Sequence, residues 1–166
     1  MVRPYVTRII QKHGREEWKA VVLTNELHHH MGLFSIAGAK MGIRARELLQ
    51  APFDAITVVS YAGFKPPYSC LNDGIQVSTG ASLGKGAIRV VDGSEPRADF
   101  ISGKKKVTLK LKREIISDIE KVIKECSEKY SFQSSRYFSE LDKLSVEYWL
   151  KWDRTHLFEE TVELSE

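Results

Sequence analysis

Apolar residues recur at three- and four-residue steps between Phe34 and Leu48, a pattern typical of a helix that buries one side. The apolar stripe consists of Phe34, Ala37, Gly38, Met41, Ala45 and Leu48. The opposite side carries Lys40, Arg44 and Glu47. The helix should stop before Pro52, because the residue before a proline disfavours helical geometry. Small residues on the buried side, including Gly38 and Gly42, should let another backbone approach closely.

Four later segments have the pattern of β-strands. Residues 55–61 are rich in β-branched residues and almost continuously apolar, which predicts a central strand buried on both sides. Residues 87–91 predict a further strand that ends at the turn Asp92-Gly93. Residues 97–101 and 107–111 predict a hairpin around Ser102-Gly103, in which the second strand has one solvated face. Helix and strand segments in this order indicate a layered α and β structure.

The C-terminal half contains two further amphipathic segments. Residues 115–126 carry apolar residues at helical spacing, and Cys126 lies among them, as expected for a core thiol. Residues 134–152 repeat the pattern with aromatic side chains, so residues 147–154 should pack in the core or form a dimer contact. At the other end of the chain, a short helix should end near Gly14. Residues 16–23 fit either a continued helix or an extended piece.

Composition limits the classes of protein to which the chain can belong. Its 166 residues, 42% hydrophobic and 28% charged, predict a single compact domain over residues 1–166. A net charge of +3 argues against a nucleic-acid partner, and the chain has no apolar run long enough for a membrane span. Residues 1–5 lack the apolar core of a signal peptide, and two cysteines make no disulfide framework. We therefore expect a cytoplasmic protein.

Three residues have side chains suited to metal coordination. His28 and His30 are two positions apart, so an extended backbone would point both imidazoles the same way. With Cys70 they supply two ring nitrogens and a thiolate, a set that zinc accepts with one position left open. Iron, nickel or copper would also fit these ligand types. The alternative is that His28 and His30 are solvated loop residues and Cys70 is a buried thiol.

The segment after Cys70 supplies further candidates for chemistry. Residues 70–80 fit a short helix with Cys70 at its start better than they fit a strand. The glycine-rich residues 80–86 do not form a P-loop, because three residues separate the first two glycines and Gly86 follows Lys85. They predict either a turn close to the histidines or an anion-binding nest. Asp73, Gln76 and Lys85 are the candidate catalytic residues beside an open metal position.

Three blocks and the C-terminal helix of this sequence resemble the FmdE family, which is named after a component of formylmethanofuran dehydrogenase. Residues 28–42 are similar to its His-Gly-His signature, residues 70–80 and 83–86 to its second and third blocks, and residues 148–154 to its C-terminal helix. The resemblance implies an α+β domain with a mixed sheet of about five strands flanked by helices, which often forms a homodimer. It also implies a metal between the histidine motif and Cys70. Family members are associated with molybdenum or tungsten formylmethanofuran dehydrogenases, whose subunits are therefore expected partners.

The chain departs from the family pattern at three positions. His29 stands where the family usually has glycine, Leu33 where it has proline, and Ala81 where many relatives have a second cysteine. Without that cysteine, a dithiol mechanism is not expected. Three hypotheses follow: a metal-binding protein with an accessory or small-molecule-binding role, a metal-dependent enzyme, or a non-catalytic interaction subunit that docks through its aromatic C-terminal helix. We favour the first.

Overall fold

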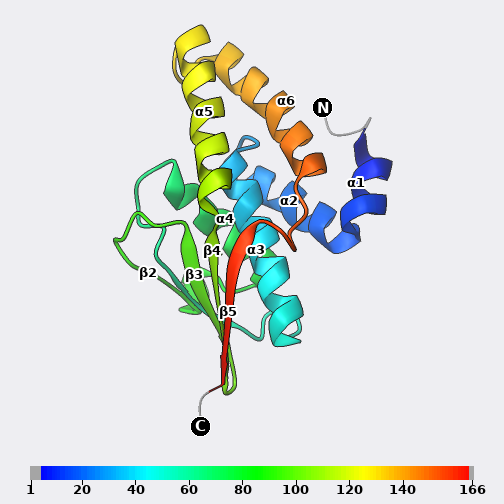
Figure 1. Cartoon of the computed structure of the whole chain (residues 1–166), viewed down its shortest axis with the longest axis vertical. Coiled ribbons are helices and arrows are strands. Elements are labelled where there is room, and N and C mark those ends of the chain that lie inside the picture. The colour runs from blue at the N-terminus through cyan, green and yellow to red at the C-terminus, as the bar shows by residue number, and fades with distance from the viewer. Residues whose placement is uncertain (1–4, 165–166) are drawn as a thin grey trace.

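A five-stranded mixed sheet and six helices make up the computed structural model, which describes residues 5–164 (Figure 1). The helices are α1 (Val6–His13), α2 (Arg15–His28), α3 (Leu33–Leu49), α4 (Leu71–Thr79), α5 (Arg113–Lys129) and α6 (Ser135–Lys151). The strands are β1 (Thr57–Ser60), β2 (Ile88–Val90), β3 (Arg97–Ser102), β4 (Lys105–Leu111) and β5 (Phe158–Leu164). Two 3₁₀ turns, η2 (Tyr68–Cys70) and η3 (Leu83–Lys85), flank α4. The fold is therefore α+β, as the family resemblance implied.

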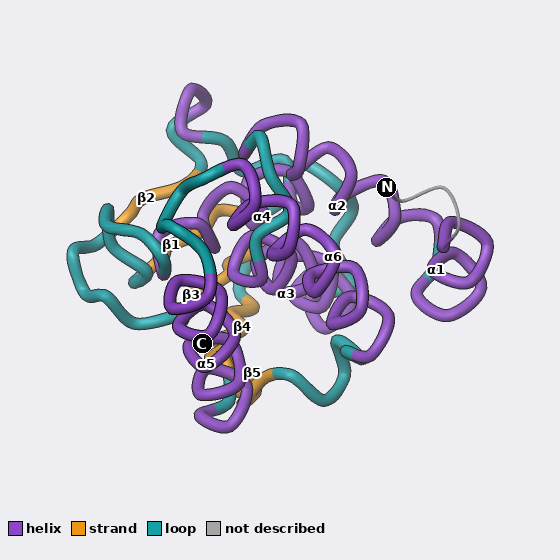
Figure 2. Tube along the Cα trace, turned by 90° about the horizontal axis from the view of Figure 1, so that it is seen from above, coloured by secondary structure: helices purple, strands orange, loops and turns teal. Residues whose placement is uncertain are grey.

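The strands lie in the order β2-β1-β3-β4-β5. The pair β1–β2 is parallel and the other three pairs are antiparallel, which makes the sheet mixed. In Figure 2 most of the helices gather on one side of the sheet, and α1 lies farthest from the strands. Side chains on the helix-facing side of the sheet, such as Val58, Phe100 and Val107, are almost fully buried. The core therefore lies between the sheet and the layer that contains α3.

The segments with clear periodicity form the predicted elements. The helix predicted from Phe34 to Leu48 is α3, the hairpin is β3–β4, and the two C-terminal helices are α5 and α6. Gly14 ends α1 with a positive φ of 88°, and residues 16–23 are helical within α2. Cys126 is a buried free thiol, as predicted. Trp149 and Trp152 are buried, so the core-packing interpretation of the aromatic C-terminal segment is confirmed.

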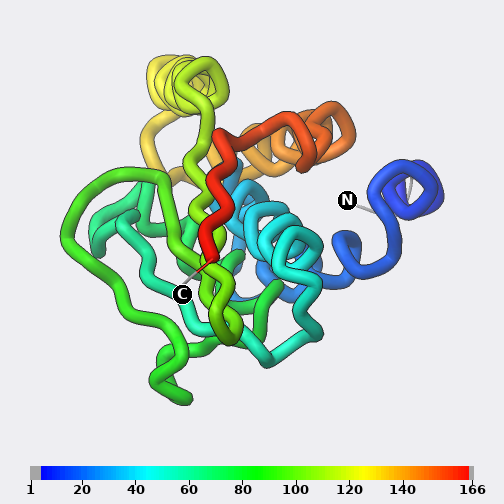
Figure 3. The backbone as a smooth tube through the Cα atoms, turned by 60° about the horizontal axis from the view of Figure 1, so that its bottom comes forward, coloured from blue at the N-terminus to red at the C-terminus, as the bar shows by residue number. Residues whose placement is uncertain are grey.

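The structure differs from the sequence-based expectations in three elements. Strand β1 was expected to be buried on both sides, but only the face with Val58 and Ser60 is buried, whereas Thr57 is exposed. Strand β5 was not predicted, and Figure 3 shows it beside β4, which makes it an edge of the sheet. In α3, Lys40 was expected on the polar side of an amphipathic helix, but its side chain is fully buried. The reason is that α2, α4, α6 and the sheet surround α3 on nearly every side.

The segments that build the histidine region are held together by polar contacts between α6 and the loop after α2. The carboxylate of Asp142 accepts a hydrogen bond from the backbone N–H of Met31 at 2.8 Å. The hydroxyl of Ser145 donates to the carbonyl of the same residue at 2.7 Å. These two bonds fix the helical hairpin α5–α6 against the segment that contains His28 and His30.

None of the helices within residues 5–164 has the length and apolar character needed to cross a bilayer. Most of the N-terminal segment used to exclude a signal peptide, residues 1–4, lies outside the described residues.

Candidate functional site

The two histidines lie on a tight turn between α2 and α3. His28 is the last residue of α2, and His29 caps that helix in the left-handed conformation, with φ 66°. The prediction of an extended backbone at this point was therefore wrong. The turn nevertheless brings the imidazoles of His28 and His30 together, with ring centroids 4.4 Å apart. Gly32 then caps the N-terminus of α3.

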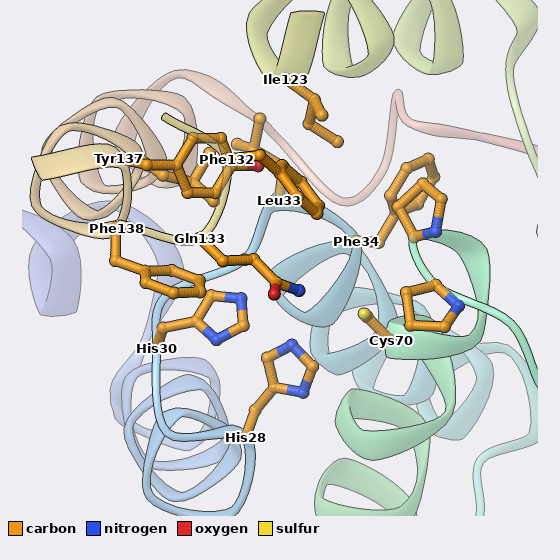
Figure 4. Close-up of a pocket in the computed structure, with 14 residues that line it drawn as sticks. His28, His30, Leu33, Phe34, Cys70, Ile123, Phe132, Gln133, Tyr137 and Phe138 are labelled. Atoms are coloured by element: carbon orange, nitrogen blue, oxygen red, sulfur yellow. The ribbon is translucent and has the colours of Figure 1, made fainter. Parts of the chain in front are cut away.

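Cys70 comes from a different part of the chain and lies opposite the histidine turn. It is the last residue of η2 and the N-cap of α4, so the prediction of a short helix starting at Cys70 is confirmed. His28, His30 and Cys70 line one cavity of about 260 Å³. Figure 4 shows the sulfur of Cys70 directed into this cavity, across from the two imidazoles. The fold thus places the three residues around one cavity.

The hydrogen bonding of His28 differs between its two ring nitrogens. The Nδ1–H group donates to the carboxylate of Asp73, on α4, at 2.7 Å. The other nitrogen, Nε2, is buried, and among residues 5–164 it makes no hydrogen bond, although the thiol of Cys70 is close enough to raise the pKa of the ring. A carboxylate that orients one nitrogen of a histidine and leaves the other free is the usual arrangement behind a metal-ligating histidine. A buried polar atom without a partner is costly, so a water molecule, an ion or another ligand should occupy the space beside this nitrogen.

Gly32 keeps the space between the two imidazoles open. A β-carbon placed on Gly32 would lie 3.6 Å from the Nε2 atom of His28 and 3.6 Å from the Nε2 atom of His30. Both nitrogens therefore face the same small region beside the backbone. The φ of Gly32 is −95°, an ordinary value that other residues adopt without strain. A β-carbon here would therefore make ordinary contacts with both ring nitrogens and one closer contact, 3.2 Å, with the hydroxyl of Ser35.

The surroundings of the two imidazoles shift their pKa values in opposite directions. The hydrogen bond to Asp73, followed by the effect of Cys70, raises the pKa of His28 to about 9 against the opposing effect of burial. Burial, followed by the positive charge of His28, lowers the pKa of His30. Since zinc binds neutral imidazole, metal must displace the Nε2 proton of His28.

We expect replacement of Asp73 by asparagine to lower the pKa of His28 from about 9 towards the ordinary value near 6.5. The measurement is an NMR pH titration of the histidine ring signals in metal-free protein. A folded-state pKa above the unfolded value gives a stabilising contribution that is complete below about pH 6.5 and is lost as the pH rises through about 9. This pH dependence of stability should therefore weaken in Asp73→Asn.

The control for that titration is Asp142→Asn. The carboxylate of Asp142 contacts the loop that follows His28, through the backbone N–H of Met31, but it is not a hydrogen-bond partner of His28. Its amide oxygen can still accept the Met31 N–H. Equal pKa values for His28 in wild-type protein and Asp73→Asn would contradict the assigned hydrogen bond.

The candidate catalytic residues lie in different places. Asp73 contacts His28, as described, whereas Gln76 and Lys85 do not line the cavity. The side-chain oxygen of Gln76 accepts a hydrogen bond from the backbone of Leu83, and Lys85 forms an exposed ion pair with Asp54. Gly80, in the glycine-rich turn, packs against Phe53 and Asp54, so this turn does not approach the histidines.

Several residues around the cavity were not identified from the sequence. The α5–α6 hairpin contributes Ile123, Phe132, Gln133, Tyr137, Phe138 and Leu141. Apart from Gln133, these residues have apolar side chains that fit core packing equally well, so no local signal distinguishes a cavity wall from a core. Ala81, at the position of the absent second cysteine, is buried outside this cavity.

Within residues 5–164, no three His, Cys, Asp or Glu side chains are arranged as a ready metal-binding group. His28, His30 and Cys70 share the cavity, but their side chains would have to rearrange to bind one ion together. Their donor types, two ring nitrogens and a thiol, are those that a tetrahedral zinc ion with an open position accepts. Such an ion would act as a Lewis acid on whatever occupies that position.

Comparison with known proteins identifies the family. Residues 27–159 match the family described as "FmdE, Molybdenum formylmethanofuran dehydrogenase operon". The chain belongs to the FmdE family. A crystal structure of a tungsten formylmethanofuran dehydrogenase FmdE-like protein from Syntrophus aciditrophicus is similar to this chain, with a TM-score of 0.56 at 14% identity. The similarity covers 90% of this chain and 73% of that one, and it shows a shared fold. No curated protein sequence matches the chain.

The FmdE signature has a structural explanation at two of the positions where this chain departs from it. His29, which replaces the usual glycine, is the left-handed C-cap of α2, and glycine adopts that conformation without strain. Leu33, which replaces the usual proline, is the first residue of α3, where proline is favoured. A glycine at position 29 and a proline at position 33 would therefore both fit the turn of this chain.

Proposed function

We propose that this FmdE-family chain binds a divalent transition metal, zinc in the first place, through His28, His30 and Cys70. The observation that carries the proposal is the buried Nε2 atom of His28, which makes no hydrogen bond with any described residue and whose ring is oriented by Asp73. Two imidazoles and a thiolate leave one of four zinc positions open, so the role proposed is accessory or small-molecule binding. Partner subunits of a formylmethanofuran dehydrogenase and a homodimer are part of the same proposal.

The chain's own residues would have distinct parts in this function. Asp73 would hold the ring of His28 in the orientation that presents Nε2 to the metal. Phe138 packs against the ring of His30, with centroids 4.9 Å apart, and would limit the rotation of that ring. Gly32 would leave room for the ion between the two nitrogens.

We expect purified wild-type protein to bind a single zinc ion per chain, measured by elemental analysis and by titration with a chromogenic zinc indicator. Gly32→Ala should weaken zinc binding by roughly 10- to 100-fold, the range seen when the surroundings of metal ligands are disturbed. Its methyl group would occupy the space that both Nε2 atoms face, although every proposed ligand is retained. His28→Ala should lose binding more completely.

The matched control is His156→Ala, which removes an exposed histidine far from the cavity and should leave zinc binding unchanged. Circular dichroism would establish that each variant is folded. Wild-type protein that takes up no zinc, iron, nickel or copper would contradict the proposed function. Unchanged zinc affinity in Gly32→Ala would place the metal elsewhere.

A further inference from the structure

The sheet has an open edge at β2, which pairs only with β1. The carbonyl of Ala87 and the N–H of Val91 form hydrogen bonds with β1. Because the peptide groups of a strand point alternately to its two sides, those of Ile88 and Val90 point away from β1. Within residues 5–164 these groups make no backbone hydrogen bond on that side. Both residues therefore present an N–H and a C=O to a further strand.

A cleft of about 500 Å³ lies along this edge. It is lined by β2 and by Asp73 and Gln76 of helix α4. Phe64 and Leu83 also line it, although they are 67% and 70% exposed. A cleft between an edge strand and a helix suits an extended segment whose main chain continues the sheet and whose alternate side chains enter the cleft.

The two charged residues of the cleft define which side chains such a segment should carry. Asp73 bonds to His28, and its carboxylate would repel an acidic side chain placed in the cleft. The side chain of Arg89 is exposed and points to the face of the sheet opposite to that of Ile88 and Val90. No ion pair in the described part of the chain involves Arg89. A complementary strand therefore has an acidic residue opposite Arg89 and an apolar residue on either side of it.

The chain itself contains this order of residues at the end of its other edge strand, β5. Val162, Glu163 and Leu164 follow one another there, and the two apolar side chains are 48% and 76% exposed. Val162 pairs with Val107, which is buried under the helices, so Val162 and Leu164 lie on the helix-facing side. Glu163 lies on the open face beside Lys106. Figure 1 shows this end of β5 extending past the end of α3, where another molecule can reach it.

Strand direction and charge both favour contact between β2 of one copy and β5 of another. The strand pairs of the sheet make β5 antiparallel to β2, so a second copy that continues the sheet presents β5 in an antiparallel orientation. Its helices then lie on the same side, and its Glu163 lies opposite Arg89. Pairing β2 with β2 would place Arg89 against Arg89, and pairing β5 with β5 would place glutamates against glutamates. Like charges directly opposite each other are destabilising.

We propose that the cleft beside β2 receives the end of β5 from a second copy of this chain. Arg89 pairs with Glu163 of the second copy, and Val162 and Leu164 of that copy pack between Phe64 and Leu83. The contact joins two different surfaces, so copies add head to tail and do not close as a two-fold dimer. None of the proposed metal ligands lines this cleft, so the inference goes beyond the proposed metal binding and does not depend on it.

The first test is sedimentation equilibrium of the full chain over a wide range of concentration. We expect the average mass of the wild type to rise with concentration. Arg89→Glu and Glu163→Arg should each weaken this association about tenfold, because each places like charges opposite one another. The double variant restores the opposite charges and should associate within about threefold of the wild type.

Lys124→Glu is the matched control, because it reverses an exposed charge on α5, away from both strands, and should leave the association unchanged. Circular dichroism establishes that each variant is folded. A wild-type mass that does not change with concentration overturns the proposal. Single variants that associate like the wild type, or a double variant that associates no better than the single ones, also overturn it.

The second test locates the contact with a synthetic peptide of residues 158–164, blocked at both ends. We expect the peptide to inhibit self-association and to shift the backbone NMR signals of Ile88 and Val90. Leu83→Ala should weaken peptide binding several-fold, whereas Phe132→Ala, which removes an equally exposed side chain outside this cleft, should not. Equal binding by a peptide that carries Glu163→Lys overturns the proposal.

The outcomes separate this inference from the proposed metal binding and from other occupants of the cleft. Self-association should be the same with and without a metal chelator, so a chain that takes up no zinc leaves this inference standing. A chain that binds zinc but does not self-associate overturns this inference alone. Peptide binding by a chain that does not self-associate assigns the cleft to a segment of another protein and overturns the second copy as its occupant.

Discussion

Replacing Gly74 by alanine is expected to destabilise the protein by about 3 kcal/mol or more, or to prevent folding. A β-carbon at this position would lie 2.2 Å from the backbone nitrogen of Ala39 and 2.2 Å from the carbonyl oxygen of Ser35. Both atoms belong to the backbone of α3, so no side-chain rotation can relieve the overlap. The helices α3 and α4 would have to separate, which would expose part of the core and displace Cys70 and Asp73.

The close approach of α3 and α4 also depends on a glycine of α3, Gly38. A β-carbon on Gly38 would lie 2.1 Å from the carbonyl oxygen of Leu71, so Gly38→Ala should be destabilising for the same reason. In an exposed helix interior, a glycine-to-alanine change is usually favourable by about 1 kcal/mol, so the expected sign is opposite to helix propensity. The control is Gly84→Ala, where a β-carbon would meet no atom within 4 Å.

The measurement is urea-induced unfolding followed by circular dichroism, with the free energy of unfolding extrapolated to water. We expect Gly84→Ala to unfold near the wild-type midpoint, within about 0.5 kcal/mol. A Gly74→Ala variant as stable as the wild type would show that α3 and α4 are farther apart than described.

The second large effect is expected at Lys40. Its ammonium group is fully buried and donates to Glu17 at 2.5 Å and to the carbonyl oxygen of Trp152 at 2.9 Å. Glu17 is also fully buried and accepts from the indole of Trp149 and from Arg154, each at 3.0 Å. Burial, the dominant effect, lowers the pKa of Lys40 to about 8 despite the attraction of Glu17. The free-energy cost of desolvating Lys40 therefore offsets much of the favourable interaction between Lys40 and Glu17.

We expect Lys40→Met to lower the free energy of unfolding by about 3–5 kcal/mol, since it leaves the buried carboxylate of Glu17 without one of its two cationic partners. Adding Glu17→Gln should cost much less than the sum of the two single changes, because the double variant has no uncompensated buried charge. Urea unfolding of the four proteins gives the coupling energy.

Lys143→Met is the control, because the ion pair of Lys143 with Glu140 is exposed and should contribute within about 1 kcal/mol. Strict additivity of the Lys40 and Glu17 changes would contradict the description of these residues as one buried network.

The helices and strands that could be predicted from the sequence are those with a clear local pattern of apolar and polar residues. Helix α5 and the hairpin β3–β4 have clear periodicity, and the structure contains them as predicted. Strand β5 was missed because three of its seven residues, Glu159, Glu160 and Glu163, are acidic. It pairs only with β4 and is exposed beyond Phe158, so it has no buried face that would give a period of two.

The sequence indicated residues that line the polar end of the cavity, but it did not indicate how they are arranged. Ligand chemistry identified His28, His30 and Cys70, and the structure places all three around one cavity. The sequence did not indicate that His28 would be oriented by Asp73, because the two residues are 45 positions apart. It also did not separate Asp73, which contacts His28, from Gln76 and Lys85, which lie away from the cavity.

The sequence by itself determined the secondary structure of most segments, the small residues that let α3 and α4 touch, and the donor types near the start of the chain. These features depend on spacing and residue type, which act over a few positions. Only the tertiary structure decided that Lys40 is buried with Glu17, that the histidines meet through a left-handed turn, and that an apolar wall faces them. These features depend on which distant segments pack together, and local periodicity carries no information about the partner that a given face will meet.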